Sequence, residues 1–457
     1  MRNFLNISSE ITNSGLIIYF QNKGYRLEYP ADTWNFVSDM TQKALLDNLT
    51  MICTMHLPMV LSEVNGINYS TSRPLLEPYL FQNFIKDLPS CTEVDEIETH
   101  SAIQKFLNIE YLFSPNKISV PANIPVTDGY KAVIGMSFGK DSLLTYAVAQ
   151  ELELNPEIVY VVEQSLTYER KHKTNLALQF KKEFDKELHI LDHDTGLLRD
   201  YTYLGVPKSE YGWGLQNTEY TLEFIPFAYS LQGKYLFFGN EQSTASYYMD
   251  STGNWRIYPC YDQSHIWTTH LDQVSQQFTA GSVRTGSLIE PLMDMMIQRT
   301  LVHRYPSIAK YQMSCFTDTE AGRNYHWCHE CSVCAKMYLL CAGSNIDPKK
   351  IGLKENMFRK EKRNLFTIFG KKSELTYLNT GLGRDEQLFA FYLAAKNNIQ
   401  GDVLENFRQS PLYSEAKERE EELIKTFCSI YDSISLPNEL KSEVIAIYQE
   451  ELDSFEI

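Results

Sequence analysis

The chain has 457 residues, and its 42 Lys and Arg side chains face 58 Asp and Glu side chains, which gives a formal net charge of −16. This acid surplus argues against a broad grip on a nucleic-acid backbone or an anionic membrane, because both need clustered cations. A hydrophobic fraction of 43% and a charged fraction of 22% are typical of globular proteins and exclude extensive disorder. A small anionic ligand remains compatible, since helix N-termini bind phosphate without net positive charge.

No apolar run approaches the roughly 18 residues that a membrane helix needs. The first residues, Met-Arg-Asn-Phe-Leu-Asn, lack an apolar signal core. We therefore expect a cytoplasmic protein without a membrane partner. Three of its nine cysteines fall within seven residues. In a reducing compartment, such clustering indicates metal binding rather than disulfides.

The first part of the chain has mixed character. Strand-like runs flank a turn of the Gln-Asn-Lys-Gly type, and two helical patterns follow. A polar, Pro-containing passage at 121–129 indicates a boundary. We therefore predict an α+β extension over 1–128, with strands at 15–20 and 24–29 and helices at 36–52 and 97–107.

The middle of the chain alternates short apolar runs with helical patterns, which is the spacing of βαβ units and predicts a parallel, doubly wound sheet in an α/β core over 129–345. The predicted strands lie at 131–136, 158–162, 188–191 and 235–238, and the predicted helices at 141–152, 170–185 and 218–231. In such sheets, ligands bind beyond the carboxyl ends of the strands.

The last part, 346–457, shows neither a cysteine cluster nor a glycine-rich loop. Its amphipathic and charged patterns predict helices at 385–396, 415–430 and 438–455, the last two paired. We expect a helical C-terminal region.

The most informative segment is Ser-Phe-Gly-Lys-Asp-Ser at 137–142, which follows a predicted strand and opens a predicted helix. The unsatisfied N–H groups and the positive dipole end of a helix N-terminus favour an anion there. Gly139 permits close backbone approach, and the hydroxyls of Ser137 and Ser142 can donate to phosphate oxygens. Lys140 adds a point charge, and Asp141 can cap the helix or hold Mg²⁺. A merely capped helix is the alternative.

The pattern Ser-x-Gly-x-Asp-Ser after the first strand of an α/β unit resembles the PP-loop of the ATP-pyrophosphatase superfamily, whose fold is HUP-like. Phe138 stands where that loop usually has its second glycine. The resemblance implies Mg-ATP held by residues 137–142, transfer of AMP to a carboxylate or carbonyl oxygen, and release of pyrophosphate. It also places adenine or ribose contacts after the second strand, at Glu163. The Walker pattern is absent.

Cys328, Cys331 and Cys334 form C-x2-C-x2-C, and Cys315 lies upstream. Four thiolates with short spacings suit a closed, tetrahedral structural Zn²⁺ site. An iron–sulfur cluster is the alternative, because closely spaced cysteines serve it too.

Order and spacing of these motifs resemble two PP-loop groups. A PP-loop, Ser-Cys and C-x2-C-x2-C are similar to 7-cyano-7-deazaguanine synthase, in which the cysteines bind zinc. The ATP-dependent UDP-N-acetylmuramoyl-L-alanyl-L-glutamate epimerases match the layout more closely. They share Gly-Lys-Asp-Ser at 139–142, Asn-Glu-x-Ser-x-x-Ser at 240–246, Ser-Cys at 314–315 and Trp-Cys at 327–328, together with a long N-terminal extension.

Further candidates lie at predicted strand ends or in polar clusters. Asn240 and Glu241 end a predicted strand, so they are expected at the same edge as the loop. His265 has the intrinsic pKa for general acid–base work. A bidentate arginine suits a carboxylate or phosphate. The remaining candidates for substrate binding are Ser243, Ser246, Gln263, Arg284 and Glu290.

The expected function is ATP-dependent adenylation of a substrate carboxylate, with catalysis by Lys140, Asp141, Glu241 and His265, resembling the glutamate epimerases. The expected cofactors are ATP, Mg²⁺ and Zn²⁺, and the expected substrate is a small or nucleotide-linked carboxylate. The sequence leaves open whether the chain forms a homodimer or assembles with another protein. One alternative is amide or nitrile formation of the deazaguanine type, including a modification that serves a defence system. Another is a tRNA sulfur-transfer enzyme with an iron–sulfur site. A third is a non-catalytic nucleotide-binding module.

Overall fold

The computed structural model describes residues 3–30, 32–127, 129–164, 172–315, 326–370, 373 and 376–455. The strands are β1 (Phe4–Thr12), β2 (Gly15–Phe20), β3 (Lys23–Glu28), β4 (Gly66–Tyr69), β5 (Glu110–Leu112), β6 (Lys131–Gly135), β7 (Glu157–Glu163), β8 (Leu188–His193), β9 (Gly233–Phe237), β10 (Tyr248–Met249), β11 (Arg256–Ile257) and β12 (Arg284–Gly286). The α-helices are α1 (Asp39–Ile52), α2 (Leu57–Val60), α3 (Glu77–Asp95), α4 (Thr99–Leu107), α5 (Lys140–Glu151), α6 (Thr174–Phe184), α7 (Gln216–Glu223), α8 (Ile225–Ser230), α9 (His265–Phe278), α10 (Asp294–Arg304), α11 (Pro306–Ala309), α13 (Ser332–Gly343), α14 (Gly381–Lys396), α15 (Asp402–Arg408), α16 (Pro411–Glu418), α17 (Glu420–Phe427) and α18 (Asn438–Asp453).

One ten-stranded sheet runs through the molecule in the order β12-β9-β6-β7-β8-β3-β2-β1-β4-β5. The pairs from β12 to β8 are parallel, β8 to β1 are joined antiparallel, and β1, β4 and β5 are parallel again. The prediction of an α/β protein with a largely parallel sheet is therefore confirmed. The strand order reverses between β6 and β9, which is where open α/β sheets place a ligand crevice.

The parallel strands are buried on both faces. In β6, Ile134 contributes to one hydrophobic cluster and Val133 to the other. Tyr160 and Val159 of β7 divide in the same way. Because successive side chains of a strand point to opposite faces, both faces are covered by apolar side chains. This explains why these strands appear in the sequence as continuous apolar runs rather than as alternating ones.

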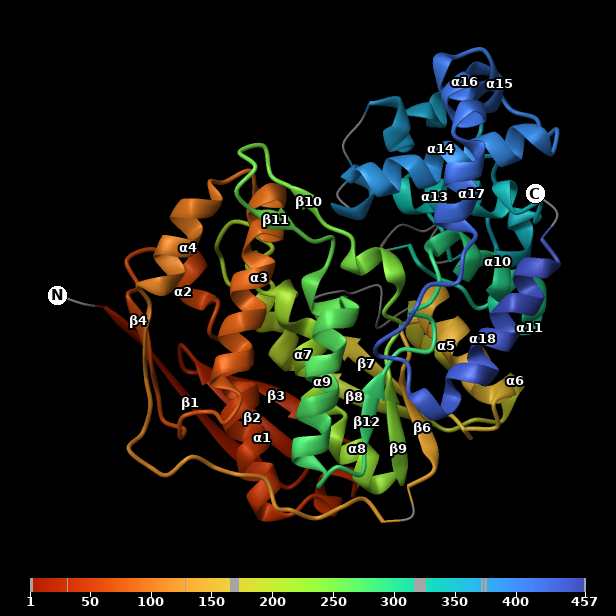
Figure 1. Ribbon diagram of the computed structural model, residues 1–457. Helices are drawn as coiled ribbons and strands as arrows, with labels where there is room; N and C mark the ends of the chain where they lie inside the picture. The colour runs from red at the N-terminus through yellow and green to blue at the C-terminus, as the bar shows by residue number, and fades with distance from the viewer. Residues whose placement is uncertain are drawn as a thin grey trace.

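The N-terminal region extends the sheet rather than standing apart from it. Strand β3 pairs with β8 through Leu27 opposite His193 and Glu28 opposite Asp192. One hydrophobic cluster holds side chains of α1 and α3 together with Val133 and Val159. Figure 1 shows the red and orange N-terminal elements continuing from the end of the parallel strands. The predicted boundary near 128 interrupts neither the sheet nor this cluster.

The C-terminal helices share the other hydrophobic cluster with the parallel strands, and Figure 1 shows α14 and α17 lying over α13 and α10. The predicted helix at 415–430 is two helices, α16 and α17, which meet at Arg419. The prediction at 218–231 likewise divides into α7 and α8, because Pro226 at the start of α8 fits a first helical turn but not a helix interior.

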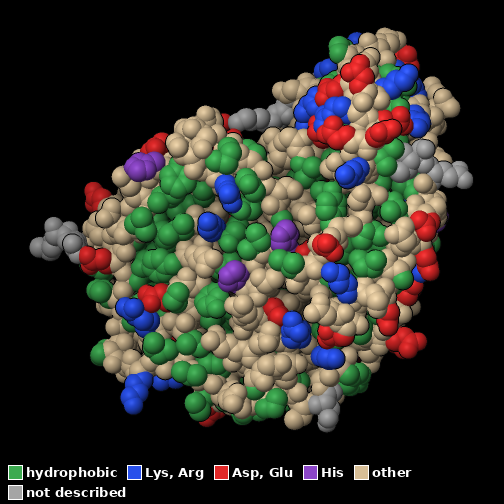
Figure 2. All heavy atoms as spheres, in the orientation of Figure 1, with side chains coloured by type: hydrophobic (Ala, Val, Ile, Leu, Met, Phe, Trp, Pro, Cys, Tyr) green, Lys and Arg blue, Asp and Glu red, His purple; other side chains and the backbone are tan. Residues whose placement is uncertain are grey.

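Among the described residues, no helix combines the length and the apolarity needed to cross a bilayer. On the face drawn in Figure 2, basic and acidic side chains are interspersed over the C-terminal helices.

The turn after β6 is anchored by an aromatic side chain. Phe138 has a left-handed backbone, with φ of 58°, and its side chain is fully buried. Its ring meets those of Tyr160 and Phe180 edge-on, at centroid distances of 6.0 and 5.7 Å. The backbone conformation costs on the order of 1–2 kcal/mol in a non-glycine residue, and burial of the ring offsets that cost.

We expect Phe138→Ala to lower the free energy of unfolding by about 3 kcal/mol, because it removes a buried ring and keeps an unfavourable backbone. Urea unfolding followed by circular dichroism measures the change. Leu178→Ala is the control: this side chain lies on α6 as Phe180 does but is 52% exposed, so its loss should cost less than about 0.5 kcal/mol. Equal midpoints for the two variants would contradict the anchoring role.

Candidate active site and metal centre

The loop at 137–142 closes on itself through its own hydroxyls. The Ser137 amide donates to Ser142 Oγ at 3.1 Å, and the two hydroxyl oxygens lie 3.2 Å apart. The Gly139 amide donates to Ser137 Oγ at 3.3 Å. Gly139 then caps α5 with no side-chain hydrogen bond. The first turn of α5 therefore presents its N–H groups at the carboxyl end of β6, as anion binding requires.

The segment after β9 lies directly against this helix start. A Cβ added at Gly239 would stand 2.7 Å from Asp141 Cβ and 3.1 Å from the Ser142 amide nitrogen. Only glycine allows so close an approach, which brings Glu241 beside the loop across the point where the strand order reverses. Asn240 is fixed here, since its Nδ2 donates to Thr268 Oγ1 at 2.9 Å and its Oδ1 accepts from Asn217 at 3.0 Å.

A cluster of buried charges borders the loop. Lys140 Nζ donates to Asp141 Oδ1 and forms ion pairs with Asp294, at the start of α10, and with Glu241 at 3.9 Å. Lys336 on α13 contacts the other oxygen of Asp294.

The ammonium group of Lys336 also lies 3.8 Å from a carboxylate oxygen of Glu386 on α14. Glu386 is held in turn by the Met295 amide and the Tyr377 hydroxyl, each at 3.1 Å. Four carboxylates thus face two ammonium groups, and the ionised set carries two excess negative charges.

Burial and charge oppose each other in this cluster. Burial by itself would lower the pKa of Lys140, but attraction to Asp141 and Glu241 outweighs it and raises that pKa. Burial raises the pKa of Asp141, with Lys140 opposing and Glu241 adding to the shift. Burial also lowers the pKa of Lys336 and raises that of Glu386. A further cation would relieve the surplus of negative charge.

The arrangement fits a divalent cation. Asp141, Glu241 and Asp294 each offer an oxygen, and these oxygens lie within 4.8 Å of one another. Glu241 Oε2 is buried and has no hydrogen-bond partner among the described residues. Carboxylate oxygens beside a phosphate site are the ligands that Mg²⁺ prefers.

Three members of the charged cluster, Lys140, Asp141 and Lys336, border a cavity of about 810 Å³, a size suited to a nucleotide-sized ligand. The aromatic side chains of Trp213 and Tyr220 form part of its wall. The N-terminal region contributes Asp87, Ser90 and Cys91 of α3. Burial raises the pKa of Asp87 to about 6. The extension is thus part of the site, although its sequence showed no catalytic spacing.

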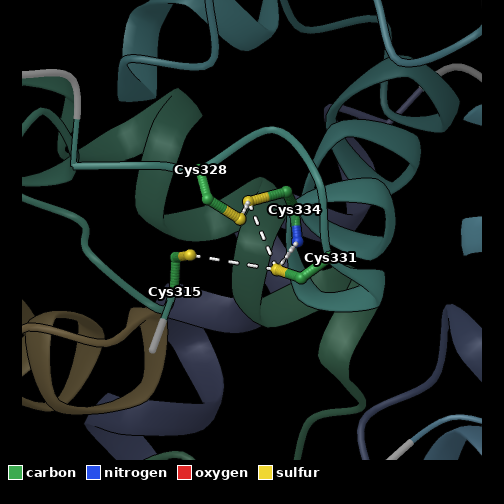
Figure 3. A group of neighbouring side chains, drawn as sticks. All are labelled: Cys315, Cys328, Cys331 and Cys334. Atoms are coloured by element: carbon green, nitrogen blue, oxygen red, sulfur yellow. Dashed lines mark hydrogen bonds between the residues drawn. The ribbon is translucent and has the colours of Figure 1, made fainter. Parts of the chain in front are cut away.

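The four predicted metal ligands converge on one point, as Figure 3 shows. The sulfur–sulfur distances are 3.8 Å for Cys315 and Cys331, 3.7 Å for Cys328 and Cys334, and 3.5 Å for Cys331 and Cys334. A tetrahedral ion with Zn–S bonds of about 2.3 Å places its sulfurs roughly 3.8 Å apart. The cluster could therefore hold one metal ion such as Zn²⁺.

Backbone amides support these sulfurs. The Glu330 amide donates to Cys328 Sγ at 3.3 Å, and the Cys334 amide donates to Cys331 Sγ at 3.5 Å. Such donors stabilise thiolates. His329 lies beside the centre, and its Nε2 accepts from the Lys354 amide at 3.1 Å. This contact indicates that His329 holds the segment around Lys354 in place.

Many of the predicted site residues come together. The cavity wall contains the loop, the end of β7 and the segments after β9 and β11, through Ser137, Gly139, Lys140, Asp141, Ser142, Glu163, Asn240 and Gln263. Phe138 differs, because its ring lies in the hydrophobic core. Burial would raise the pKa of Glu163, but Arg199 and His193 hold that pKa well below its usual range.

Other predicted residues have partners within the fold. Glu290 is buried and accepts from the Ser433 hydroxyl at 2.5 Å and from the amides of Ile434 and Ser435 at 3.0 and 2.8 Å. It therefore holds the C-terminal segment. Arg284 begins β12, at the opposite end of the strand from the site, and forms a two-pronged ion pair with Asp272 at 2.8–3.0 Å. Both residues are engaged in structural contacts.

His265, Ser243 and Ser246 lie near the site but are not part of the described cavity wall. His265 is the first residue of α9, which Ser264 caps. Ser243 is buried in the short 3-10 turn after Glu241, and Ser246 follows that turn.

Three buried charges were missed from the sequence: Asp294, Lys336 and Glu386. Lys336 is the only charge in the apolar helix α13, and because buried charges need partners this was an available signal. Glu386 stands in Arg-Asp-Glu-Gln at 384–387, where neighbouring polar residues hide any such signal. Asp294 follows β12, whose three residues give no apolar run.

Comparison with family models, with curated proteins and with solved structures found no match for this chain.

We expect Cys331→Ser to lower bound zinc by about one equivalent per chain relative to the wild type, because a closed site needs all four thiolates. Elemental analysis of the purified proteins measures this. Cys428→Ser, a buried cysteine outside the cluster, should leave the zinc content unchanged. Iron in place of zinc, or wild-type zinc content in Cys331→Ser, would contradict the zinc assignment.

Proposed function

We propose that this chain is a doubly wound PP-loop enzyme that activates a substrate carboxylate as an acyl adenylate, with ATP as the donor and pyrophosphate as the leaving group. The main support for this proposal is the position of the loop at 137–142 on the wall of the cavity. Its hydroxyls, the start of α5, Lys140 and Asp141 border one cavity, and oxygens of Glu241 and Asp294 lie within 4.8 Å of an oxygen of Asp141.

The residues divide into two roles. Ser137, Gly139 and Ser142 offer hydroxyl and amide donors for phosphate oxygens. Asp141, Glu241 and Asp294 would hold Mg²⁺, which when bound neutralises phosphate charge as pyrophosphate leaves. Lys140 is poised between these groups and can exchange its contact with Asp294 for a phosphate. The attacking carboxylate forms a bond to the α-phosphorus, and the bond to the pyrophosphate oxygen breaks.

Lys336 provides a second cation on the cavity wall. An ammonium group there can attract the substrate carboxylate toward the phosphates, and it compensates Asp294 and Glu386 at the same time. In this proposal, Lys336 lies in the part of the cavity that binds the substrate carboxylate.

The motif layout favours a muramyl-dipeptide glutamate as the substrate, with adenylation acidifying the neighbouring C–H bond so that epimerisation follows. The second candidate is amide or nitrile formation of the deazaguanine type. The metal centre beside the cavity, where Ser314 lines the wall next to Cys315, fits both candidates.

We expect ATP–pyrophosphate exchange that depends on a carboxylate, and Asp141→Asn to lower it by at least about a hundredfold, because this change removes a metal ligand and a partner of Lys140. The panel contains UDP-N-acetylmuramoyl-L-alanyl-L-glutamate and a deazaguanine acid. Exchange of the substrate α-proton with solvent separates the two candidates. Glu187→Gln, an exposed carboxylate, is the control. Exchange with no member of the panel, or undiminished exchange in Asp141→Asn, would argue against adenylation.

We expect Lys336→Met to reduce exchange and to lower the free energy of unfolding by about 3–5 kcal/mol, because buried Glu386 loses its cation and buried Asp294 loses one of its two. The double variant Lys336→Met with Glu386→Gln should recover part of the stability without recovering exchange. Thermal unfolding and exchange assays separate the two effects. Full exchange activity in the double variant would show that Lys336 only stabilises the fold.

A further inference from the structure

A second charged cluster lies behind the cavity wall, where β7 and β8 end side by side. Glu163 and His193, the last residues of these strands, are paired in the sheet register. Glu219 and Glu223 are one turn apart on α7 and therefore project from the same face. Two strand ends and one helix thus direct an imidazole and three carboxylates to one point.

The distances within this cluster match those between ligands of one ion. His193 Nε2 lies 2.9 Å from Glu219 Oε1 and 3.0 Å from Glu223 Oε1. Neighbouring ligands of an octahedral ion with bonds of about 2.1 Å stand roughly 3.0 Å apart. The donor atoms of these three residues all lie within 4.8 Å of one another.

The burial of this cluster is close to complete. Side-chain exposure is 0% for His193 and Glu223, 1% for Glu219 and 4% for Glu163. Arg199 contacts Glu163 at 2.6 Å and also pairs with Glu219. It is the one permanent cation that the described contacts of this cluster contain. Three buried carboxylates face one guanidinium and one imidazole, and with the imidazole neutral the set carries two excess negative charges.

A carboxylate oxygen of this cluster lacks a hydrogen-bond partner among the described residues. Glu223 Oε2 is buried and has no hydrogen-bond partner among the described residues, whereas both oxygens of Glu219 have partners. The backbone also leaves no room for a side chain at Gly196. A Cβ there would stand 2.3 Å from Glu163 Oε2 and 2.7 Å from His193 Nδ1. Glycine at this position lets the backbone pack directly against Glu163 and His193 and so fixes the orientation of the imidazole.

We propose that His193, Glu219 and Glu223 bind a divalent first-row metal ion of the Mn²⁺ or Zn²⁺ type. One imidazole with carboxylate oxygens is a mixed nitrogen and oxygen ligand set, which suits these ions better than Mg²⁺. An imidazole that binds a metal must be neutral, and with His193 neutral the ion balances the two excess negative charges of the cluster. It is distinct from the ion at the cysteines and from the carboxylates beside Lys140.

The position gives this ion a structural task at the cavity. Glu163 and Tyr220 line the cavity, and the Tyr220 hydroxyl donates to Glu163. The ion lies one side chain behind that wall, so it fixes the ends of β7 and β8 against α7. Glu219 also accepts from Cys53 Sγ at 3.2 Å, which connects the same point to the N-terminal region.

Mn²⁺ titration of the full-length protein, followed by electron paramagnetic resonance, tests the proposal. We expect one Mn²⁺ per chain that shows coupling to an imidazole nitrogen, which the carboxylates beside Lys140 cannot provide. Glu223→Gln should weaken this binding at least tenfold, because a ligand oxygen and its charge are lost. Asp141→Asn is the matched control and should leave the nitrogen-coupled Mn²⁺ unchanged.

Thermal unfolding separates loss of the ion from loss of the fold. Mn²⁺ should raise the melting midpoint of the wild type, because it binds only the folded chain, and should not raise that of Glu223→Gln. Without metal, Glu223→Gln should be about as stable as the wild type, since the amide has the same shape and replaces a buried carboxylate for which the described contacts show no ion pair with Arg199. Absence of nitrogen-coupled Mn²⁺ in a wild type that carries no metal beyond the cysteine site, or equal Mn²⁺ affinity in Glu223→Gln, would overturn the proposal.

Discussion

Asp294 between two lysines is the interaction on which the candidate active site depends. Its carboxylate is 1% exposed and touches Lys140 with one oxygen and Lys336 with the other. A buried carboxylate without a cation costs several kcal/mol, so these contacts set where the helices that carry them can sit. They join the starts of α5 and α10 to α13, and through Glu386 they reach α14. Because Lys336 follows Cys334 by two positions, the metal centre and the charged cluster share one helix.

Local patterns in the sequence were sufficient where the physical cause is local. The apolar runs of β6 to β9 and the loop at 137–142 were located to within a few residues. Strands β1, β4 and β12 were not predicted: β12 consists of Arg-Thr-Gly and has no apolar pattern. The joint between β3 and β8 consists of two residue pairs remote in sequence. Periodicity carries no information on such pairing, so the N-terminal region was predicted as a separate extension.

The same distinction between local and tertiary causes applies to the residues of the candidate site. Residues at the carboxyl ends of strands, such as Glu163 and Asn240, were predicted to meet, and they line one cavity. Candidates chosen for their chemistry alone, such as Arg284 and Glu290, form structural contacts elsewhere. Asp294, Lys336 and Glu386 come from three helices, and only tertiary packing brings them together. Position at the end of a strand therefore predicted which residues line the cavity, whereas residue type alone did not.

The way the sheet ends has a consequence for solubility. Both outer strands, β12 and β5, are three residues long, so the ten-stranded sheet offers little unpaired backbone at its margins. Short edge strands of this kind discourage pairing between chains. Strand β8, in contrast, has six residues, and β3 pairs with it at Leu27 and Glu28. Removing the first 128 residues would leave Asp192 and His193 of β8 unpaired and would uncover the apolar face that α1 and α3 share with the parallel strands. Exposure of such a face would favour association between chains.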